Sequence, residues 1–347
     1  MLCDDPRVIA VFDGHNDSLT RDDADRFASG REGGHLDLPR ARAGGLAGGI
    51  FAVFTPTPGE EGGPVGRAGG GHETEPAAAI GQEVAAPHAA RALGRLIGLE
   101  RAGHVRIARA AGDLDAARAA GVLAAVGHLE GAEAIDPGLE ALELFHAAGL
   151  RSLGPVWSRP NAFGHGVPFA CPSSPDTGPG LTRAGVALAR RCAELGIAFD
   201  LSHLNEAGFW DAARLDAAPL IASHSGAHAL CPASRNLTDA QLDAIGASGG
   251  LVGVVFAVAF LRADGGDEPD TPLEAIVAHV RHVADRIGVE HVALGSDFDG
   301  ATVPAPLGDV TGLPRLLDAL RAGGFDEGEL RAIAWDNWRR VLEAAWG

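Results

Sequence analysis

Residues 8–17 read Val-Ile-Ala-Val-Phe-Asp-Gly-His-Asn-Asp, and the rest of the sequence is organised around this stretch. The apolar run 8–12 predicts a buried strand, and the polar residues after it lie at the carboxyl end of that strand. His15 and Asp17 are two positions apart, so on an extended segment their side chains point to the same side. A histidine and a carboxylate placed in this way suit a metal ion, although the same pattern also fits a polar turn.

Strand-like and helix-like segments alternate along the chain, which is typical of parallel βα units. Its 347 residues are enough for two ordinary domains or for one α/β barrel. The alternation favours the barrel, so we expect residues 1–347 to form one (β/α)8 domain of the TIM type with extra C-terminal helices. Apolar runs that fit strands buried on both faces occur at 8–12, 49–54, 122–127, 150–156, 197–201, 219–222, 250–256 and 291–295. The extra helices are expected at 313–322, 326–335 and 337–346.

Capping signals support three of the helices between the strands. Thr271, Pro272 and Glu274 make the pattern of a capped helix start with proline at the first helical position. The segment 237–242 reads as a capping box with a hydrophobic staple, and the segment 181–195 carries one apolar stripe and ends before a glycine. Two stretches rich in proline and glycine predict long surface loops after the second and fourth strands, at 56–76 and 158–180.

Composition excludes several classes of function. The net charge of −18 argues against a nucleic-acid partner, because phosphate binding needs clustered basic residues. The sequence contains no lysine, which excludes a Walker P-loop lysine, a Schiff-base lysine and a carbamylated lysine that bridges metals. The four cysteines form no Cys-x-x-Cys motif and are expected to pack as small apolar residues. Neither a signal peptide nor a membrane span is recognisable, so we expect a cytoplasmic protein without a membrane partner.

Possible metal ligands follow several of the predicted strands. In a closed barrel the carboxyl ends of the strands converge on one mouth, so these side chains are expected to meet. Three imidazoles and two carboxylates suit two borderline metals such as Zn²⁺. Glu130 is then the natural bridging ligand, with His15 and Asp17 completing one metal and His203 and His224 completing the other. A single histidine beside a strand is more often a hydrogen-bonded rim residue, but five such residues at four strand ends favour a metal site.

The remaining histidines receive other interpretations. His128 shares strand parity with Glu130 and is a candidate to orient that carboxylate. His279 lies off the apolar stripe of its helix and is expected to be solvated. The same exposed, non-functional interpretation is given to His35, His72, His88, His104, His146, His282 and His291.

Six motifs together resemble the renal, or membrane, dipeptidase family of metallopeptidases within the amidohydrolase superfamily of barrels. The motifs are Asp-Gly-His-Asn-Asp at 13–17, Glu-Gly at 130–131, Asp-Leu-Ser-His at 200–203, Ser-His-Ser at 223–225, Arg-Asn at 235–236 and Gly-Ser-Asp-Phe-Asp-Gly at 295–300. The resemblance runs from Val8 to about Arg340. It implies a two-zinc site made of the five residues named above, Arg235 as the clamp for the terminal carboxylate of the substrate, and Asp297 as the catalytic acid and base.

One departure from the family concerns the stretch after the fourth predicted strand. Many members carry a substrate-contacting histidine there, whereas Trp157 stands near that place in this sequence. Contact with the scissile carbonyl would then fall to zinc alone, to Arg159, to Asn161 or to His165. We therefore count Trp157 and Asn161 among the candidate substrate-binding residues.

These features predict a binuclear zinc dipeptidase. Two zinc ions that share Glu130 would hold a bridging hydroxide that attacks the peptide carbonyl, while Asp297 carries the proton to the leaving amine. Arg235 would bind the free C-terminus of a short peptide through two parallel hydrogen bonds. The resemblance adds tolerance for a D-residue at the C-terminal position, and a homodimer is the candidate assembly. One alternative is another amidohydrolase reaction at the same metals, on N-acyl amino acids or cyclic amides; a second is a metal-binding protein without activity.

Overall fold

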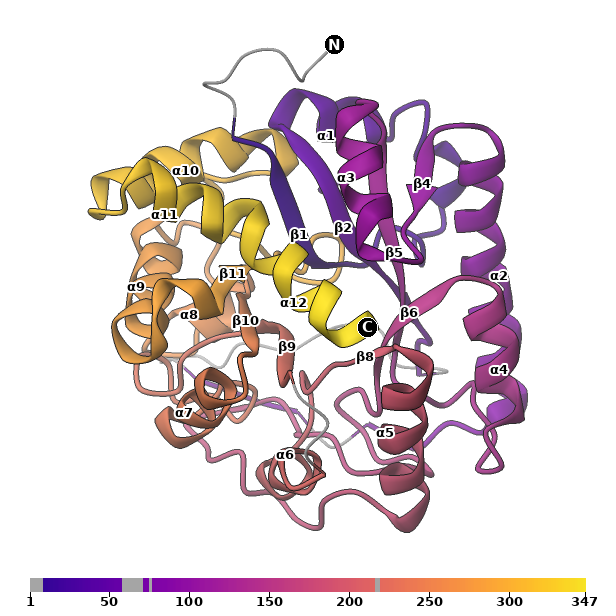
Figure 1. Ribbon diagram of the computed structural model, residues 1–347. Coiled ribbons are helices and arrows are strands. Elements are labelled where there is room, and N and C mark those ends of the chain that lie inside the picture. Colours follow the sequence, from indigo (N-terminus) through magenta and orange to yellow (C-terminus); the bar gives the residue numbers. More distant parts are fainter. Residues whose placement is uncertain (1–8, 58–70, 75–76, 216–218) are drawn as a thin grey trace.

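The computed structural model describes residues 9–57, 71–74, 77–215 and 219–347, and short parallel strands form its centre (Figure 1). One sheet has the order β1 (Val11–Asn16), β2 (Leu46–Phe54), β5 (Leu123–Glu130), β6 (Leu150–Gly154) and β8 (Ala198–Phe199). A second sheet has the order β11 (Val292–Leu294), β10 (Leu251–Val254) and β9 (Ile221–Ser225). Parallel bridges from Asp200 to Ile221 and from Asn16 to Phe298 connect the two sheets on both sides.

The predicted TIM-type barrel is therefore confirmed. Each of the eight predicted apolar runs overlaps one of these strands, except that Val8 in the first run lies outside the described residues. Three further strands, each two or three residues long, were not predicted. β4 (Val105–Ile107) pairs with the beginning of β5, and β3 (His72–Glu73) pairs antiparallel with β7 (Ala170–Cys171). The predicted loop 56–76 contains β3, while its residues 58–70 and 75–76 lie outside the described residues.

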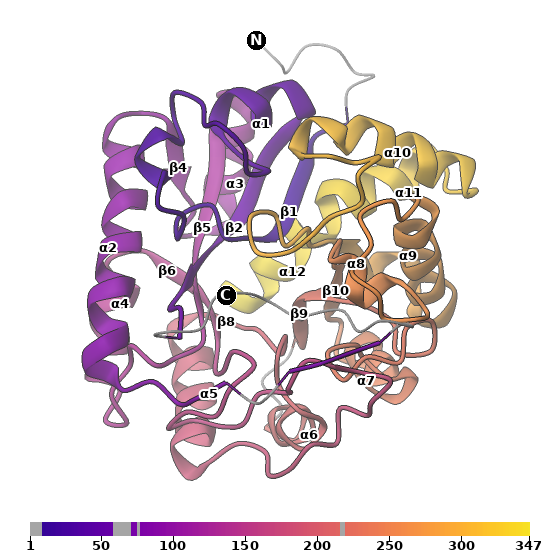
Figure 2. The same ribbon diagram turned by 180° about the vertical axis from the view of Figure 1, so that it is seen from behind.

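Helices surround the strands on the outside (Figures 1 and 2). They are α1 (Leu38–Gly44), α2 (Gln82–Arg101), α3 (Ala111–Ala119), α4 (Glu140–Ala147), α5 (Arg183–Leu195), α6 (Glu206–Ala213), α7 (Asp239–Ala247), α8 (Val258–Leu261), α9 (Glu274–Ile287), α10 (Leu313–Ala322), α11 (Glu327–Arg331) and α12 (Asn337–Trp346). Short 3-10 turns lie at Ala24–Arg26, Val289–His291 and Val310–Gly312, and a π-helical turn, Ala332–Asp336, joins α11 to α12. The extra C-terminal helices thus occupy the predicted segments. Among the described residues, no helix has the length and apolar character needed to cross a bilayer.

The capping predictions are confirmed at two helices and wrong at one. Thr238 and Gln241 form the capping box of α7, and Gly196 ends α5 in the left-handed conformation, with φ of 63°. α9 begins only at Glu274, without a side-chain cap. The Thr271 hydroxyl instead donates to the carbonyl of Glu268, at 2.7 Å, which closes a turn before the helix.

The last helix closes the amino-terminal end of the barrel, where it crosses in front of the strands in Figure 1. The fully buried Trp338 of α12 packs against Phe12 of β1, with ring centroids 5.8 Å apart, and donates from its indole nitrogen to the carbonyl of Leu294, at 2.9 Å. Gly14 gives this packing its room, because a Cβ atom there would lie 2.6 Å from the carbonyl oxygen of Ser223. The strands are therefore plugged at this end, and the loops at the opposite end, which Figure 2 shows from their side, are placed to surround an active-site pocket.

Candidate metal centre and active site

The five predicted metal ligands meet at the carboxyl end of the barrel. The Glu130 carboxylate, at the end of β5, lies at their centre: its Oε1 atom is 2.9 Å from Nε2 of His203, 3.5 Å from Nε2 of His224 and 3.6 Å from Nε2 of His15. The Asp17 carboxylate lies 3.6 Å from His15 Nε2 on the other side. All five side chains are buried. Groups that are separated by up to about two hundred residues in the sequence therefore form one cluster.

The arrangement of these donor atoms fits bound cations. Nε2 of His203 and Nε2 of His224 lie 3.0 Å apart, and both face the same carboxylate oxygen. Neither ring nitrogen of the buried His15 has a hydrogen-bond partner among the described residues. Lone pairs that converge without donors are unfavourable in a buried site, whereas a cation satisfies all of them. In the part of the chain that the structure describes, three sets of three donors lie close enough to hold a cation: Glu130 with His203 and His224, Glu130 with His15 and Asp17, and Asp200 with His15 and His224. The first two sets together contain the five predicted ligands.

Serine hydroxyl groups contact the Nδ1 atoms of two of the imidazoles, opposite the Nε2 atoms that face the cluster. Nδ1 of His203 lies 2.8 Å from the Ser158 hydroxyl, and Nδ1 of His224 lies 2.8 Å from the Ser223 hydroxyl. Ser223 in turn donates to the Asp200 carboxylate, at 2.5 Å. Contacts of this kind orient the rings so that Nε2 of each points into the cluster. Sequence reasoning did not find Ser158, because nothing in its local pattern distinguishes it from other loop serines.

The electrostatics of the cluster are set by burial and by close opposite charges. Burial opposes protonation of His15, but the charges of Glu130 and Asp17 outweigh it and raise the pKa of that imidazole. Burial lowers the pKa of His203 to about 4 and places the pKa of His224 well below its usual range. Although burial alone would raise it, the pKa of Glu130 is held well below its usual range by His15 and by hydrogen bonds from the imidazoles. Glu130 is therefore a carboxylate and His203 and His224 are neutral imidazoles, the protonation states that bind a metal, whereas His15 would give up its proton to a bound cation.

Asp297 lies beside this cluster, after β11. Its backbone N–H donates to the carbonyl of His15, at 3.0 Å, and its backbone is left-handed, with φ of 60°. Burial, followed by the nearby charge of Asp17, raises the pKa of the Asp297 carboxyl group to about 7. The buried Asp13, which sequence reasoning left without a role, accepts hydrogen bonds from Ser296 N, at 2.7 Å, and from Ser296 Oγ, at 2.9 Å. Asp13 thus ties the end of β1 to the segment that carries Asp297.

A pocket of about 690 Å³ opens above the cluster, and Asp297 and Arg235 line it together with four of the proposed ligands, Asp17, Glu130, His203 and His224. Arg235 is buried; it donates to Ser225 Oγ, at 2.9 Å, and to the carbonyl of His224, at 2.8 Å. Its Nε–H has no partner among the described residues. Burial lowers the pKa of Arg235 to about 10, which leaves the guanidinium charged at neutral pH. A fixed cation with free hydrogen-bonding capacity therefore faces the pocket.

Trp157 belongs to an aromatic wall of the same pocket. Its ring centroid lies 5.0 Å from that of Phe54, 5.4 Å from that of Phe169 and 5.8 Å from that of His203. The stretch after β6 thus presents an apolar surface to the pocket.

The other candidates near Trp157 face away from the pocket. The buried Arg159 forms an ion pair with Glu133, at 2.8 Å, and donates to the carbonyl of Thr55. Asn161 donates to the carbonyl of Pro155, at 2.8 Å, and accepts from backbone N–H groups, so it holds a turn. Nδ1 of His165 is bonded to the carbonyl of Gly180, at 3.2 Å. This geometry argues against the expected substrate contact of Asn161, because its polar atoms are already used within the loop.

Several histidine interpretations need correction. His279 is buried, because α8 and the loop after β9 cover the polar side of α9; its Nδ1 accepts from Ala227 N, at 2.9 Å, and its Nε2 bonds to the carbonyl of Leu261, at 3.0 Å. His72 is buried as well, with Nδ1 2.9 Å from the carbonyl of Gly265.

His128 lies beneath the cluster, where its partners are Ser152 and Asp200 and not Glu130. Its Nδ1 is 2.8 Å from the Ser152 hydroxyl, and its Nε2 is 3.6 Å from the Asp200 carboxylate. His128 and Glu130 do lie two residues apart on β5, but the polar groups nearest to the His128 ring come from β6 and from the residue that follows β8.

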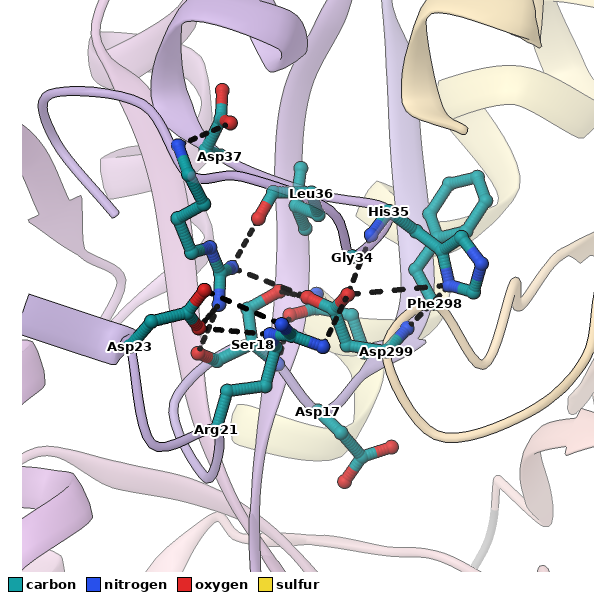
Figure 3. Close-up of polar contacts among 12 residues, drawn as sticks. Asp17, Ser18, Arg21, Asp23, Gly34, His35, Leu36, Asp37, Phe298 and Asp299 are labelled. Atoms are coloured by element: carbon teal, nitrogen blue, oxygen red, sulfur yellow. Dashed lines mark hydrogen bonds and ion pairs between the residues drawn. The ribbon is translucent and has the colours of Figure 1, made fainter. Parts of the chain in front are cut away.

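The exposed, non-functional interpretation of His35 also needs correction, since His35 lines the pocket and belongs to a hydrogen-bond network around Asp299 (Figure 3). The fully buried Asp299 carboxylate accepts hydrogen bonds from Ser18 Oγ, at 3.0 Å, from Arg31, at 3.2 Å, and from His35 N, at 2.6 Å. In return, the backbone N–H of Asp299 donates to Nδ1 of His35, at 3.0 Å. This network joins the loop after β1 to the loop after β11, next to Asp17 and Asp297. The motif at 295–300 contained Asp299, but its partners are distant in the sequence.

The comparisons with known proteins agree with this geometry. The family model described as membrane dipeptidase (peptidase family M19) matches residues 7–346. The solved structure of the dipeptidase AC, a metallopeptidase of family M19, is 49% identical, with a TM-score of 0.92 over 98% of this chain and 100% of that chain. A metallopeptidase from Rhodobacter sphaeroides, solved with a phosphinate mimic of the dipeptide L-Ala-D-Ala, is 48% identical, with a TM-score of 0.92 and the same coverage.

A protein encoded in the pqqA 5′ region of Klebsiella pneumoniae is 53% identical over 245 residues, which make up 71% of this chain and 90% of that protein. The resemblance noted from the six motifs is thus confirmed over nearly the whole chain. The chain belongs to the membrane dipeptidase family, peptidase family M19, and is a metallo-dipeptidase.

Proposed function

We propose that this protein hydrolyses the peptide bond of dipeptides at a site that holds two zinc ions. The observation that carries the proposal is the position of Glu130, whose Oε1 atom lies within 3.6 Å of three imidazole Nε2 atoms. In this assignment Glu130 is shared, His15 and Asp17 complete one site, and His203 and His224 complete the other. Histidine and carboxylate ligands in these numbers are typical of zinc.

The chain's own residues bind and orient the substrate. When bound, the zinc ions supply an activated water and polarise the scissile carbonyl. Arg235 binds the terminal carboxylate of the peptide, since its guanidinium is fixed by two hydrogen bonds and keeps its charge when buried. Asp297 takes up a proton and delivers it to the leaving amine. Its burial brings its pKa into the neutral range, where a carboxyl group can both accept and release a proton, and positive charge bound nearby favours the ionised form.

The substrate is a dipeptide with a free C-terminus, and the site tolerates a D-residue at the C-terminal position. Support for this tolerance comes from the related Rhodobacter sphaeroides enzyme, whose bound ligand mimics L-Ala-D-Ala. The aromatic wall around Trp157 packs against substrate side chains in place of a polar contact to the carbonyl. A single domain, a homodimeric assembly and a cytoplasmic location stay predictions.

A substrate panel on zinc-loaded enzyme tests this function. The panel contains L,L-, L,D- and D,D-dipeptides, a dipeptide amide without the terminal carboxylate, an N-acyl amino acid and a lactam. We expect turnover of dipeptides, loss of that turnover on chelation, and at least about tenfold weaker kcat/KM for the amide, because Arg235 loses a charge-assisted partner. Faster turnover of the N-acyl amino acid or the lactam would replace dipeptide hydrolysis with the alternative amidohydrolase reaction.

A further inference from the structure

Asp267 stands out among the acidic residues that line the pocket. Asp17 and Glu130 belong to the proposed zinc site, Asp297 lies beside it, and Asp299 is paired with Arg31. Asp267 has no ion-pair partner among the described residues. Its carboxylate instead accepts one hydrogen bond, from the Thr302 hydroxyl at 3.0 Å. The pocket therefore contains one acidic group that is held in place and not neutralised.

Asp267 follows α8, is held by Thr302 from the loop after β11, and belongs to none of the donor sets that the described part of the chain offers to a metal. The charges that most affect the pKa of Asp267 are those of His72 and Glu268. Burial raises the pKa of Asp267, which means that its surroundings disfavour an uncompensated charge. A cation in the pocket next to Asp267 would relieve this cost. Because Asp267 is not part of these donor sets, we expect that cation on a side chain of the substrate and not at the scissile bond.

The order of the strands indicates which substrate residue comes near Asp267. Arg235 follows β9 and Asp297 follows β11, and β10 pairs with both of these strands. The proposed roles of Arg235 and Asp297 place the C-terminal residue of the dipeptide between them, since one binds its carboxylate and the other its amine. That residue therefore lies over the carboxyl end of β10, where α8 and then Asp267 follow in the chain.

The surface between these groups suits a long side chain with a charged end. Ala257, Ala259 and Phe260, which follow β10, line the pocket, and the two alanine side chains are small. The rings of Phe260 and Phe169 lie 5.8 Å apart and form one apolar surface. The methylene groups of lysine, ornithine or arginine pack on such surfaces while their charged ends reach a polar group.

We propose that Asp267 is a specificity residue that binds the cationic side chain of a basic C-terminal residue of the substrate. The proposal rests on the proposed function, because it uses the positions assigned to Arg235 and Asp297. Its chemistry is a charge-assisted hydrogen bond between an ammonium or guanidinium group and a carboxylate that Thr302 orients.

The test compares Ala-Lys with Ala-norleucine, in the C-terminal configuration that the enzyme turns over faster, because norleucine is close to lysine in shape and lacks the charge. In the zinc-loaded wild type, kcat/KM should be higher for Ala-Lys. In the Asp267→Asn variant the ratio of the two values should fall about tenfold or more, since one charge-assisted bond is lost. The amide oxygen introduced by this substitution keeps an acceptor for the Thr302 hydroxyl. The matched control is Glu268→Gln, at the exposed neighbouring acid, which should leave the ratio within about twofold.

Two further arms complete the experiment. The pair Lys-Ala and norleucine-Ala places the charge on the N-terminal residue, and its ratio should not respond to Asp267→Asn. Asp267→Arg should raise the kcat/KM of Ala-Glu relative to that of Ala-Lys. An unchanged Ala-Lys to Ala-norleucine ratio in Asp267→Asn, or a response only in the N-terminal pair, would overturn the proposal. Absence of turnover for every dipeptide would instead contradict the proposed function, so the two failures are distinguishable.

Discussion

At the scale of single residues, the assignment depends on which carboxylate touches the imidazoles and which does not. Glu130 lies within 3.6 Å of three of them, whereas Asp297 is bonded through its backbone N–H to the carbonyl of His15 and forms no ion pair with an imidazole of the described residues. In the proposed assignment, this difference separates the carboxylate that holds metal from the one that carries a proton. Neighbouring carboxylates in one pocket can thus have distinct roles because their surroundings differ.

Substitution of Asp297 by asparagine tests this separation. We expect Asp297→Asn to keep its zinc and to lower kcat by about a hundredfold or more, because the amide occupies the same space and cannot transfer a proton. Zinc content by elemental analysis and steady-state rates on one dipeptide measure the two effects. Loss of zinc in proportion to activity would show that Asp297 is a ligand or a structural residue. The Asp264→Asn variant, at an exposed acid that pairs with Arg262, serves as the control.

At the scale of elements, β1 connects the site to the packing at the opposite end of the barrel. His15 of β1 belongs to the cluster, whereas Phe12 of β1 packs against Trp338 of the C-terminal helix α12. Gly14 lies between them, and a Cβ there would lie 2.6 Å from the backbone oxygen of Ser223 and 2.9 Å from that of Leu294. Backbone atoms of neighbouring strands cannot move aside without disturbing the sheet.

The Gly14→Ala variant should therefore be destabilised by about 1–3 kcal/mol, the usual cost of forcing an extra methyl group into a packed core. Chemical denaturation of the metal-free protein measures the free energy of unfolding. The control is Gly94→Ala on α2, where no atom lies within 4 Å of the added Cβ. This variant should have the same free energy of unfolding as the wild type or be more stable by up to about 1 kcal/mol. Equal stability of the two variants would contradict the packing described for β1.

His279 on α9 gives an element-scale prediction about pH. Burial lowers its pKa in the folded protein from an ordinary 6.5 to about 4, so below pH 6.5 the unfolded chain binds this proton more readily. Stability must then fall as the pH falls from about 6.5 to about 4, by roughly 2 kcal/mol at pH 5 from this residue alone. His279→Gln can keep the contacts to Ala227 N and the Leu261 carbonyl without titrating.

The metal-free wild type should thus lose more stability between pH 7.5 and pH 5 than metal-free His279→Gln, measured by denaturant unfolding. Ligand histidines titrate equally in both proteins and cancel in the comparison. The same acid sensitivity in both proteins would mean that His279 is not buried as a neutral ring.

At the scale of the whole molecule, the sequence predicted those features that repeat along the chain. Short apolar runs marked the barrel strands, and the polar residues after them supplied the cluster, because parallel strands bring their carboxyl ends to one rim. Features made by contacts between distant segments could not be predicted in this way. His279 looked solvated because the backbone groups that cover it come from the loop after β9 and from α8, and β3 is only two residues long. Likewise, Asp267 stood out only once its place in the pocket and its lack of a cationic partner among the described residues were known.

The central claim is that five side chains from four strand ends hold two zinc ions around one carboxylate. Anomalous diffraction measured at the zinc absorption edge, on crystals of the active enzyme, tests it most directly. We predict two zinc peaks, one among His15, Asp17 and Glu130 and the other among Glu130, His203 and His224. A single peak, peaks elsewhere in the molecule, or active crystals without a transition metal would contradict this account.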